Sequence, residues 1–350
     1  MTRASPRFDV VFRCDGGHAV GLGHVKRCLA VAAILRDAHG LDCALAGAFS
    51  TAAGEVVHQA GIEALGIPSG ADEAEWLGQV VRYARAQVLV CDVRTDLPPR
   101  ALLKIKRDLA LLVTLDDASE RRLVSDIALL PPTEHALSLP WPDFRGEALI
   151  GWAWVVLAAP ADARGATRVV REPPYQILVT MGGADPFDLT ARLARNLRVF
   201  AENIMPHFVI GPAFNDADAL IASIRGMWPC GRIYQDLPDL RAPIREADLA
   251  ICTYGVTALE LAAAGVPALY LSLTPDHAQS ADALAATGAG QNLGCLDALK
   301  DEDIRMQISR SLRNAQARER MSVAGPRAID GCGAQRIAER IMRAMKARAA

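Results

Sequence analysis

The sequence predicts an α/β protein built from two domains, each with a parallel sheet. Its 350 residues exceed the size at which a single hydrophobic core usually stops growing. Short runs rich in Val, Leu, Ile and Ala alternate with longer helical patterns along the chain, as in βαβ units. Between Leu157 and Pro174 this alternation gives way to Ala, Arg and Pro, which indicates a linker. We therefore expect Rossmann-like domains over residues 1–157 and 174–350.

The expected strands bring polar residues and glycines to one edge of each sheet. Several of these strands end in an acidic residue or a glycine, and ligands bind at the carboxyl ends of the strands in open parallel sheets. The polar tail from Asp301 to Ala350 is expected to be helical, with its last helix as a candidate to pack back on the first domain. The expected strands are Phe8–Arg13, Asp42–Gly47, Gln87–Asp92, Leu111–Asp116 and Asp126–Leu130, then Tyr175–Met181, His207–Gly211, Ala247–Cys252 and Ala268–Leu273.

Composition argues against several classes of partner. Lys and Arg total 38 against 40 Asp and Glu, so no excess charge attracts nucleic acid or anionic lipid. The cysteines form no Cys-x-x-Cys pair, which favours reduced thiols. The start of the chain lacks the pattern of a secretory signal, and no apolar run reaches the roughly 20 residues that cross a bilayer. We expect a cytoplasmic protein that binds neither nucleic acid nor membrane.

A first candidate site follows the first strand, where Phe12–Leu29 reads FRCDGGHAVGLGHVKRCL. Its glycines permit close backbone approach, and the start of the following helix offers unpaired N–H groups with a partial positive charge. That field disfavours a charged imidazole at His24, which could then accept a proton. The alternative is a tight turn with a capping or packing histidine, in which Asp15 forms the turn and Arg27 is a solvated helix charge.

Two segments of the second domain suit a phosphate or a nucleotide. Met181–Asp185 carries a Gly-Gly pair directly after a strand. In the more specific segment, Ala247–Leu261, a strand leads into a Gly-x-Thr turn at a helix start, with Glu260 one turn further on. A carboxylate there can accept two hydrogen bonds from ribose hydroxyls. The alternative is a capping threonine followed by an exposed glutamate.

These motifs resemble those of a known family. Phe12–Leu29 is similar to the start of the UDP-sugar hydrolases of pseudaminic acid biosynthesis, which open with Phe-Arg-x-Asp, then Gly-x-Gly-His and Arg-Cys-Leu. Their substrate is UDP-2,4-diacetamido-2,4,6-trideoxy-β-L-altrose. Met181–Asp185 and Tyr254–Glu260 resemble the same family and the lipid II-forming N-acetylglucosaminyltransferase. The resemblance spans nearly the whole chain and implies a GT-B-like fold, in which two Rossmann-like domains face each other across a cleft.

The resemblance also implies a reaction and the residues that perform it. Water would attack the anomeric carbon with inversion and release UDP and a free diacetamido sugar, without a cofactor. His24 corresponds to the family's general base, and Asp15 is the second catalytic candidate. The implied substrate-binding residues are Arg13, Gly21, Gly23, Arg27, Asp92 and Asp117, and the implied UDP-binding residues are Gly182, Gly183, Asp185, Tyr254, Gly255, Val256, Thr257, Glu260, His277 and Gln279.

The chain also departs from the family pattern. Asp92 is followed by Val-Arg-Thr-Asp instead of a nearby tyrosine, and Pro131–Glu134 replaces an Asn-rich segment. These departures concern the sugar and leave a non-catalytic sugar-nucleotide-binding protein as an alternative. A GT-B glycosyltransferase, which would use the same cleft but deliver the sugar to an acceptor, is a second alternative. Asp216-Ala217-Asp218 has the spacing of a metal-dependent transferase motif but lies in a polar helix start far from the glycine loops. We therefore expect no required metal.

Overall fold

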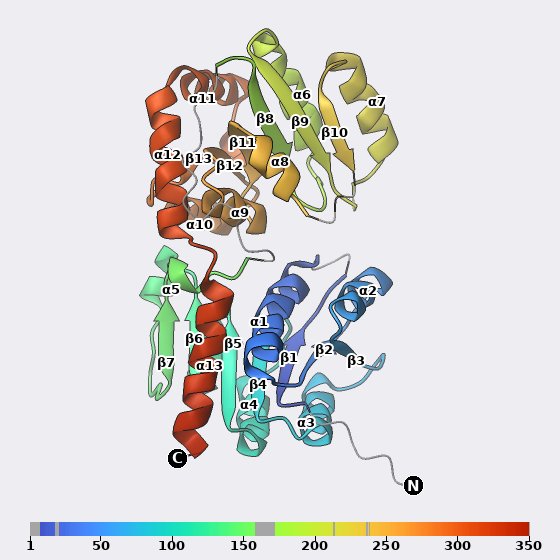
Figure 1. The fold of residues 1–350 in the computed structure, drawn as a ribbon, viewed down its shortest axis with the longest axis vertical. Helices are drawn as coiled ribbons and strands as arrows, with labels where there is room; N and C mark the ends of the chain where they lie inside the picture. The colour runs from blue at the N-terminus through green and yellow to red at the C-terminus, as the bar shows by residue number, and fades with distance from the viewer. Residues whose placement is uncertain are drawn as a thin grey trace. The chain divides into compact units, whose positions relative to one another are not determined.

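The computed structural model describes residues 8–17, 21–157, 172–212, 214–235, 237 and 239–349. The chain divides into two compact units, which are Met1–Pro160 with Gly331–Ala350 (unit 1) and Ala161–Asp330 (unit 2). Each unit contains one parallel sheet flanked by helices (Figure 1). The prediction of two Rossmann-like parallel-sheet domains is therefore confirmed.

Unit 1 contains a parallel sheet of seven strands among its described residues, in the order β3-β2-β1-β4-β5-β6-β7. Short 3₁₀ turns occupy Lys106–Asp108, Glu120–Val124 and Trp152–Trp154. The strands are β1 (Val10–Cys14), β2 (Cys43–Gly47), β3 (Glu63–Gly66), β4 (Val88–Asp92), β5 (Leu111–Leu115), β6 (Ile127–Leu130) and β7 (Glu147–Ile150), and the helices are α1 (Gly23–His39), α2 (Thr51–Gln59), α3 (Glu73–Ala84), α4 (Pro99–Ile105), α5 (Glu134–Ser138) and α13 (Gly333–Ala349).

The strand order of unit 1 reverses between β1 and β4. These two strands are hydrogen-bonded neighbours, and Cys14 at the end of β1 is the register partner of Asp92 at the end of β4. In open α/β sheets the connections leave a reversal point toward opposite faces, and ligands bind just outside the carboxyl ends of the strands there. The loop after β1 therefore begins at the position where a site is expected.

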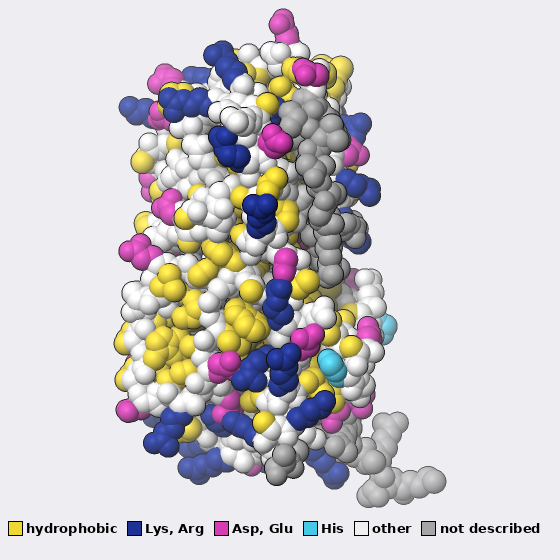
Figure 2. Space-filling model, turned by 60° about the vertical axis from the view of Figure 1, so that its left-hand side comes forward, with side chains coloured by type: hydrophobic (Ala, Val, Ile, Leu, Met, Phe, Trp, Pro, Cys, Tyr) yellow, Lys and Arg dark blue, Asp and Glu magenta, His cyan; other side chains and the backbone are white. Residues whose placement is uncertain are grey.

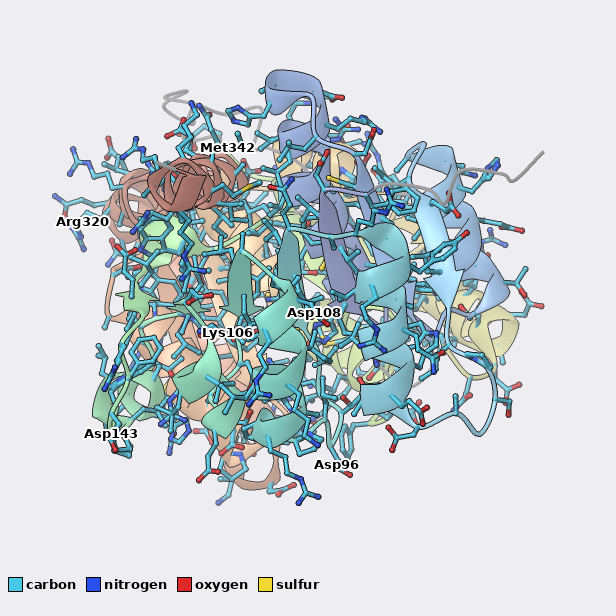
Figure 3. The ribbon with its side chains drawn as sticks, turned by 90° about the horizontal axis from the view of Figure 1, so that it is seen from below. Asp96, Lys106, Asp108, Asp143, Arg320 and Met342 are labelled. Atoms are coloured by element: carbon cyan, nitrogen blue, oxygen red, sulfur yellow. The ribbon has the colours of Figure 1, made fainter. Side chains whose placement is uncertain are left out.

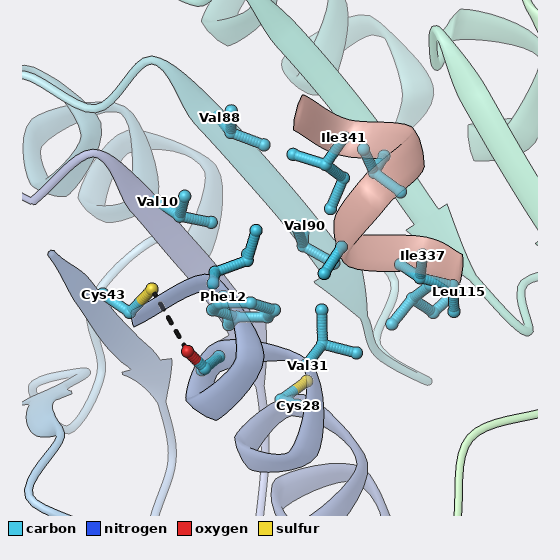
Figure 4. Packing of buried hydrophobic residues seen from close by; sticks show 14 of the residues in the cluster. Val10, Phe12, Cys28, Val31, Cys43, Val88, Val90, Leu115, Ile337 and Ile341 are labelled. Atoms are coloured by element: carbon cyan, nitrogen blue, oxygen red, sulfur yellow. Dashed lines mark hydrogen bonds between the residues drawn. The ribbon is translucent and has the colours of Figure 1, made fainter. Parts of the chain in front are cut away.

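The last helix of the chain packs on unit 1. Ile337 and Ile341 of α13 are buried against β4 and β5, in a cluster that also holds Phe12 and Val90 (Figure 4). Arg348 donates to Asp126 at 2.6 Å, and this ion pair lies near the start of β6. The apolar residues at i and i+4 explain why this polar-looking helix covers the face of the sheet on which α1 lies.

The opposite face of the sheet in unit 1 is covered by α3 and α4. Asp72 caps α3 by accepting a hydrogen bond from the N–H of Glu75 at 2.8 Å. The buried residues of α3, among them Trp76, Leu77 and Val81, recur at helical spacing and pack on this face. Lys106 and Asp108 follow α4 and are in view when the molecule is seen from below (Figure 3).

Unit 2 contains a six-stranded parallel sheet among its described residues, in the order β10-β9-β8-β11-β12-β13. The order reverses between β8 and β11, and 3₁₀ turns occupy Arg198–Phe200 and Leu296–Ala298. The strands are β8 (Tyr175–Thr180), β9 (Ile204–Ile210), β10 (Arg232–Gln235), β11 (Leu249–Thr253), β12 (Ala268–Ser272) and β13 (Gly290–Cys295), and the helices are α6 (Leu189–Leu197), α7 (Ala217–Met227), α8 (Arg241–Glu246), α9 (Val256–Ala263), α10 (Pro275–Ala285), α11 (Asp301–Arg313) and α12 (Ala315–Ala328).

The surface carries charges of both signs. On the face drawn in Figure 2, Lys and Arg side chains are interleaved with Asp and Glu side chains. This distribution agrees with the formal net charge of −2.

Within the part of the chain that the structure describes, no helix is both long and apolar enough to span a membrane.

Candidate functional site

A cluster of charged side chains lies at the strand reversal of unit 1. His24 and Arg27 stand three residues apart near the start of α1, and therefore on one face of the helix. Both reach Asp92 at the end of β4. Nδ1 of His24 lies 2.7 Å from Oδ1 of Asp92, while Nε and Nη2 of Arg27 donate to its two oxygens at 2.6 Å each. The structure thus brings together three of the site residues that the sequence predicted.

The charge of Asp92 determines which nitrogen of His24 carries a proton. Asp92 is 0% exposed, and burial by itself raises the pKa of its carboxyl. The charge of Arg27 and the hydrogen bonds from His24 and Arg27 outweigh burial, so the pKa is lowered overall. An ionised carboxylate only accepts hydrogen bonds, which requires Nδ1 of His24 to be the donor. In the neutral ring, Nε2 then carries the lone pair.

Nε2 of His24 is therefore the nitrogen that can accept a proton. The side chain is 17% exposed, and both of its close polar contacts with described residues are made by Nδ1. Nη2 of Arg27 lies 3.2 Å from Nδ1, but both groups are donors, so this approach is not a hydrogen bond. A carboxylate that orients a histidine while the far nitrogen stays available is the arrangement of a general base.

Arg27 is paired on both of its sides. Its Nη1 donates to Oδ2 of Asp116 at 3.1 Å, next to the fork on Asp92. Burial lowers the pKa of the guanidinium, but the negative charges of Asp92 and Asp116 raise it by more than burial lowers it. The pKa is therefore raised overall, and Arg27 stays charged. The alternative of Arg27 as a solvated helix charge is therefore wrong. Asp92 in turn is too deeply buried to touch a substrate directly, and it acts by holding His24 and Arg27.

The described glycines before α1 make close backbone contacts near the start of this helix. Gly21 has a φ of +68°, and it exchanges two backbone hydrogen bonds with Gly17, at 3.1 and 2.7 Å. A side chain on Gly16 would come within 2.6 Å of Val25 of α1. Gly23 is the first residue of α1, directly before His24. Gly16 was not among the predicted site residues, although its place in a Gly-Gly pair after a strand is a signal for close approach.

Arg13 and Asp15 hold this loop in place. Arg13 is 2% exposed and donates from Nη1 to Oδ1 of Asp15 at 2.5 Å and from Nε to Glu73 at 2.8 Å. The same oxygen of Asp15 also accepts from the N–H of Ala48 at 2.8 Å. Because its guanidinium is buried and paired, Arg13 does not fit the predicted direct contact with substrate. Asp15 likewise ties the loop to the segment after β2.

Of the Asp116-Asp117 pair, only the first residue joins the site. Asp117 is 3% exposed, and its oxygens accept from Nε of Arg121 at 2.6 Å and from the N–H of Ser119 at 2.9 Å. The predicted substrate contact of Asp117 is therefore corrected to a structural ion pair. Asp116 has a φ of +49° and turns its carboxylate toward Arg27 and Arg94. Asp117, and not Asp116, was among the predicted site residues.

In unit 2, two loops meet at the carboxyl ends of β8 and β11. Gly182 has a φ of +80°, which favours glycine, and Oγ1 of Thr253 lies 4.0 Å from the position of a Cβ on Gly182. A side chain on Gly211 would come within 2.6 Å of the carbonyl oxygens of Gly182 and Gly183. The predicted Gly-Gly segment and the Tyr254-Gly255 segment therefore lie next to each other at the strand reversal of this unit.

The start of α9 has the features of an anion site. Gly255 precedes the helix without a side chain that could cap it, and first-turn N–H groups lack partners within a helix. Thr257 and Glu260 are half-buried and share one face. The Tyr254 ring lies 6.5 Å from the ring of His277 at the start of α10. Val256, His277 and Gln279 are exposed at these two helix starts.

Asp185 has a different role from the predicted one. Its two carboxylate oxygens accept from the N–H groups of Leu189 and Thr190, at 2.9 and 2.7 Å, and so cap α6. Because both oxygens of Asp185 accept hydrogen bonds from α6 and its negative charge repels a diphosphate, the predicted UDP contact of Asp185 does not fit.

Asp216 precedes α7 with a φ of +47°. The described residues include no group of three or more His, Cys, Asp or Glu placed to hold a metal ion.

The two parallel sheets and their strand orders define the GT-B fold of glycosyltransferases, which solved structures share with this chain. MurG of Acinetobacter baumannii aligns with a TM-score of 0.69 and 18% identity, covering 97% of this chain and 100% of that one. No protein-family model matches the chain.

Sequence comparison finds a relative along most of the chain and a second one over a shorter stretch. The chain is 24% identical over 331 residues to the spore coat polysaccharide biosynthesis protein SpsG of Bacillus subtilis (strain 168), covering 92% of this chain and 94% of that protein. A shorter match, 33% identical over 143 residues, is to a UDP-N-acetylglucosamine–N-acetylmuramyl-(pentapeptide) pyrophosphoryl-undecaprenol N-acetylglucosamine transferase of Thiobacillus denitrificans (strain ATCC 25259 / T1). It covers 39% of this chain and 37% of that protein.

Proposed function

We propose that the protein is a UDP-sugar hydrolase, which releases UDP and a free diacetamido-trideoxy sugar for the biosynthesis of a nonulosonic acid of the pseudaminic type. The observation that carries this proposal is the His24–Asp92 pair at the strand reversal of unit 1, in which Nδ1 of His24 lies 2.7 Å from Oδ1 of Asp92 and Nε2 makes no hydrogen bond with the described residues. The identity of the sugar rests on the resemblance of the Phe12–Leu29 motif to the hydrolases of that pathway.

In the proposed reaction, His24 activates a water molecule. The water oxygen attacks the anomeric carbon, and its proton passes to Nε2 of His24. The bond from that carbon to the β-phosphate oxygen breaks, and the electron pair leaves with UDP. Attack opposite the leaving group inverts the anomeric configuration. Asp92 stabilises the imidazolium as it forms, because its carboxylate accepts from Nδ1 at 2.7 Å.

The nucleotide half of the proposal rests on unit 2. The N–H groups at the start of α9 suit a diphosphate, and Glu260 suits the ribose hydroxyls. The name of the relative from Thiobacillus denitrificans specifies a UDP-N-acetylglucosamine donor, which supports a UDP-sugar as ligand. We place the UDP contacts at Gly182, Gly183, Tyr254–Thr257, Glu260, His277 and Gln279.

A glycosyltransferase is the second candidate. It is favoured by the same relative, whose name describes sugar transfer, and by the GT-B fold. Here the base would deprotonate an acceptor hydroxyl instead of water, with the same residues. A non-catalytic binding protein would keep the UDP contacts of unit 2 but leave the donor intact.

The hydrolase, the glycosyltransferase and the binding protein differ in whether UDP is released and in whether its release needs an acceptor. Purified protein is incubated with a panel of UDP-sugars that includes UDP-2,4-diacetamido-2,4,6-trideoxy-β-L-altrose and UDP-N-acetylglucosamine, and UDP release is followed with and without candidate acceptors. We expect UDP release without an acceptor, and a product of inverted anomeric configuration by NMR. Release only with an acceptor would establish the transferase, and UDP binding without any release would establish the binding protein.

A further inference from the structure

We propose that Asp116 and Arg94 are positioning residues for His24, acting through Arg27 and Asp92. This inference rests on the proposed function, because it concerns how the base of that reaction is held. Neither residue was among the predicted site residues. Arg94 falls in the segment after Asp92 where the chain departs from the resembling hydrolases, so the resemblance does not imply its part in the arrangement.

Asp116 is held from several sides. Its N–H donates to the carbonyl oxygen of Leu129 at 2.7 Å, and its own carbonyl accepts from Nη1 of Arg94. Nη2 of Arg94 donates to Oδ2 of Asp116 at 2.9 Å. The φ of +49° is uncommon for a residue with a side chain, and such conformations concentrate at functional sites. Arg94 thus fixes both the backbone and the carboxylate of Asp116.

The fixed carboxylate of Asp116 orients Arg27. Oδ2 of Asp116 accepts from Nη1 of Arg27 at 3.1 Å, while Nε and Nη2 of Arg27 remain on Asp92. Arg27 and His24 share Oδ1 of Asp92, at 2.6 and 2.7 Å. A shift of the Arg27 guanidinium on Asp92 therefore changes the hydrogen bond that orients the imidazole of His24. The contacts thus form a series that runs from Arg94 through Asp116, Arg27 and Asp92 to His24.

Charges around the base are balanced in this arrangement. The cations Arg27 and Arg94 face the anions Asp92 and Asp116. Among the described residues, the thiols of Cys28 and Cys14 are also titratable neighbours, and Sγ of Cys28 lies 3.9 Å from Oδ2 of Asp92. Burial raises the pKa of the Cys28 thiol, which stays neutral. Removing the Asp116 charge leaves excess positive charge and disfavours an imidazolium, whereas removing the Arg94 charge favours it.

The two substitutions should therefore shift the pH dependence in opposite directions. In Asp116→Asn the acid limb of the kcat profile should move to lower pH, and in Arg94→Met to higher pH, each by about 0.3–0.5 pH units. Both variants should lose about 10- to 100-fold in kcat, because a misplaced base is inefficient, while KM changes less than about twofold. Arg82 and Asp108 form an exposed ion pair in the same unit, so Asp108→Asn and Arg82→Met are matched controls.

A second readout on the resting protein does not depend on turnover. The low-field proton resonance of the His24 Nδ1–H, identified by its loss in His24→Asn, should move in Asp116→Asn and Arg94→Met and stay unchanged in both controls. An unmoved resonance together with an unmoved acid limb would overturn the positioning role, as would a raised KM at unchanged kcat, which indicates direct substrate contact. If His24→Asn keeps full turnover, the assignment of His24 as the base of the proposed reaction fails, and the resonance still tests the contacts.

Discussion

Arg27 and Asp92 form a forked ion pair in which Nε and Nη2 of the arginine each donate to a separate carboxylate oxygen at 2.6 Å. This geometry depends on the planar guanidinium, because an ammonium group presents a single point charge to a carboxylate. The carboxylate of Asp92 is fully buried, so it has no access to water in place of Arg27. We therefore expect the pair to contribute to the local stability of the strand end that carries the site.

Arg27→Met should destabilise unit 1 locally by about 3–5 kcal/mol, the usual cost of leaving one partner of a buried pair uncompensated. Arg27→Lys should lose less, since it keeps the charge without the fork. Hydrogen exchange of the β4 peptide, measured by mass spectrometry, reports the change in this unit alone. Exchange of β4 at the wild-type rate in Arg27→Met would show that the pair contributes little.

A methyl group at Gly47 is expected to disrupt the same region. Gly47 ends β2, and a Cβ there would lie 1.8 Å from the carbonyl oxygen of Cys14, which precedes the glycine loop. Backbone cannot move aside cheaply, so Gly47→Ala should lower the thermal stability of the protein and reduce soluble yield. Gly54→Ala is the control, because a Cβ at Gly54 meets nothing within 4 Å. Equal melting temperatures for the two variants would contradict this expectation.

The central strands could be predicted from the sequence, but the outer ones could not. All nine expected strands are present, with ends displaced by up to three residues, as at β9, which begins at Ile204 rather than His207. The strands missed were β3, β7, β10 and β13, which form the outer edges of the two sheets. An edge strand is covered less completely and needs no continuous apolar run. Polar residues such as Glu63 and Arg232 interrupt the apolar pattern, so these strands were not predicted.

The site could be predicted only as far as local motifs reach. His24 and Arg27 stand in one motif, and their spacing on a helix was readable. Their common partner Asp92 lies 65 or more residues further along the chain, and its role as an anchor follows from strand order. Whether Asp116 or Asp117 faces the site depends on one left-handed residue, which no pattern of residue types specifies.

Unit 2 should lose stability in mild acid because of His207. Burial, and then the positive charge of Arg232, lowers the pKa of this histidine, whereas Glu246 and Asp248 act in the opposite direction. Below the ordinary histidine pKa of about 6.5, His207 binds a proton in the unfolded chain but stays neutral in the folded protein until the pH reaches its lowered pKa. Stability should therefore fall as the pH drops through about 6.5 toward the lowered pKa.

The measurement is the melting temperature as a function of pH, for the wild type and for His207→Gln, which removes the titrating ring. Nε2 of His207 lies 2.7 Å from Oε1 of Gln176, so glutamine retains a neutral donor at this position. The acid loss should be smaller in the variant. An identical pH dependence in both proteins would assign the loss to other groups.

Glu260 should contribute to UDP affinity. A hydrogen bond to a charged acceptor is worth roughly 1.5–3 kcal/mol, so Glu260→Ala should weaken UDP binding by about tenfold or more. Glu319→Ala removes an exposed carboxylate from the same unit and serves as the control. Both affinities are measured by titration calorimetry. Unchanged affinity in Glu260→Ala would overturn the assignment of the ribose contact.

His24→Asn should abolish most turnover while leaving UDP affinity nearly unchanged. A positioned general base contributes about 10²- to 10⁴-fold, and the asparagine side chain cannot accept a proton from water near neutral pH. In the wild-type enzyme the rate should fall on the acid side, because a protonated Nε2 no longer accepts. Rates are measured under substrate saturation across pH, and UDP affinity by calorimetry.

His39 is a matched control, since it is an exposed histidine at the other end of α1. His39→Asn should keep both turnover and the acid limb. Hydrogen exchange of the β4 peptide shows whether the Asp92 region of His24→Asn is intact. If that folded variant turns over the true substrate at nearly the wild-type rate, another group activates the water. Asp15, whose Oδ1 is committed to Arg13 and Ala48, is the next residue to replace.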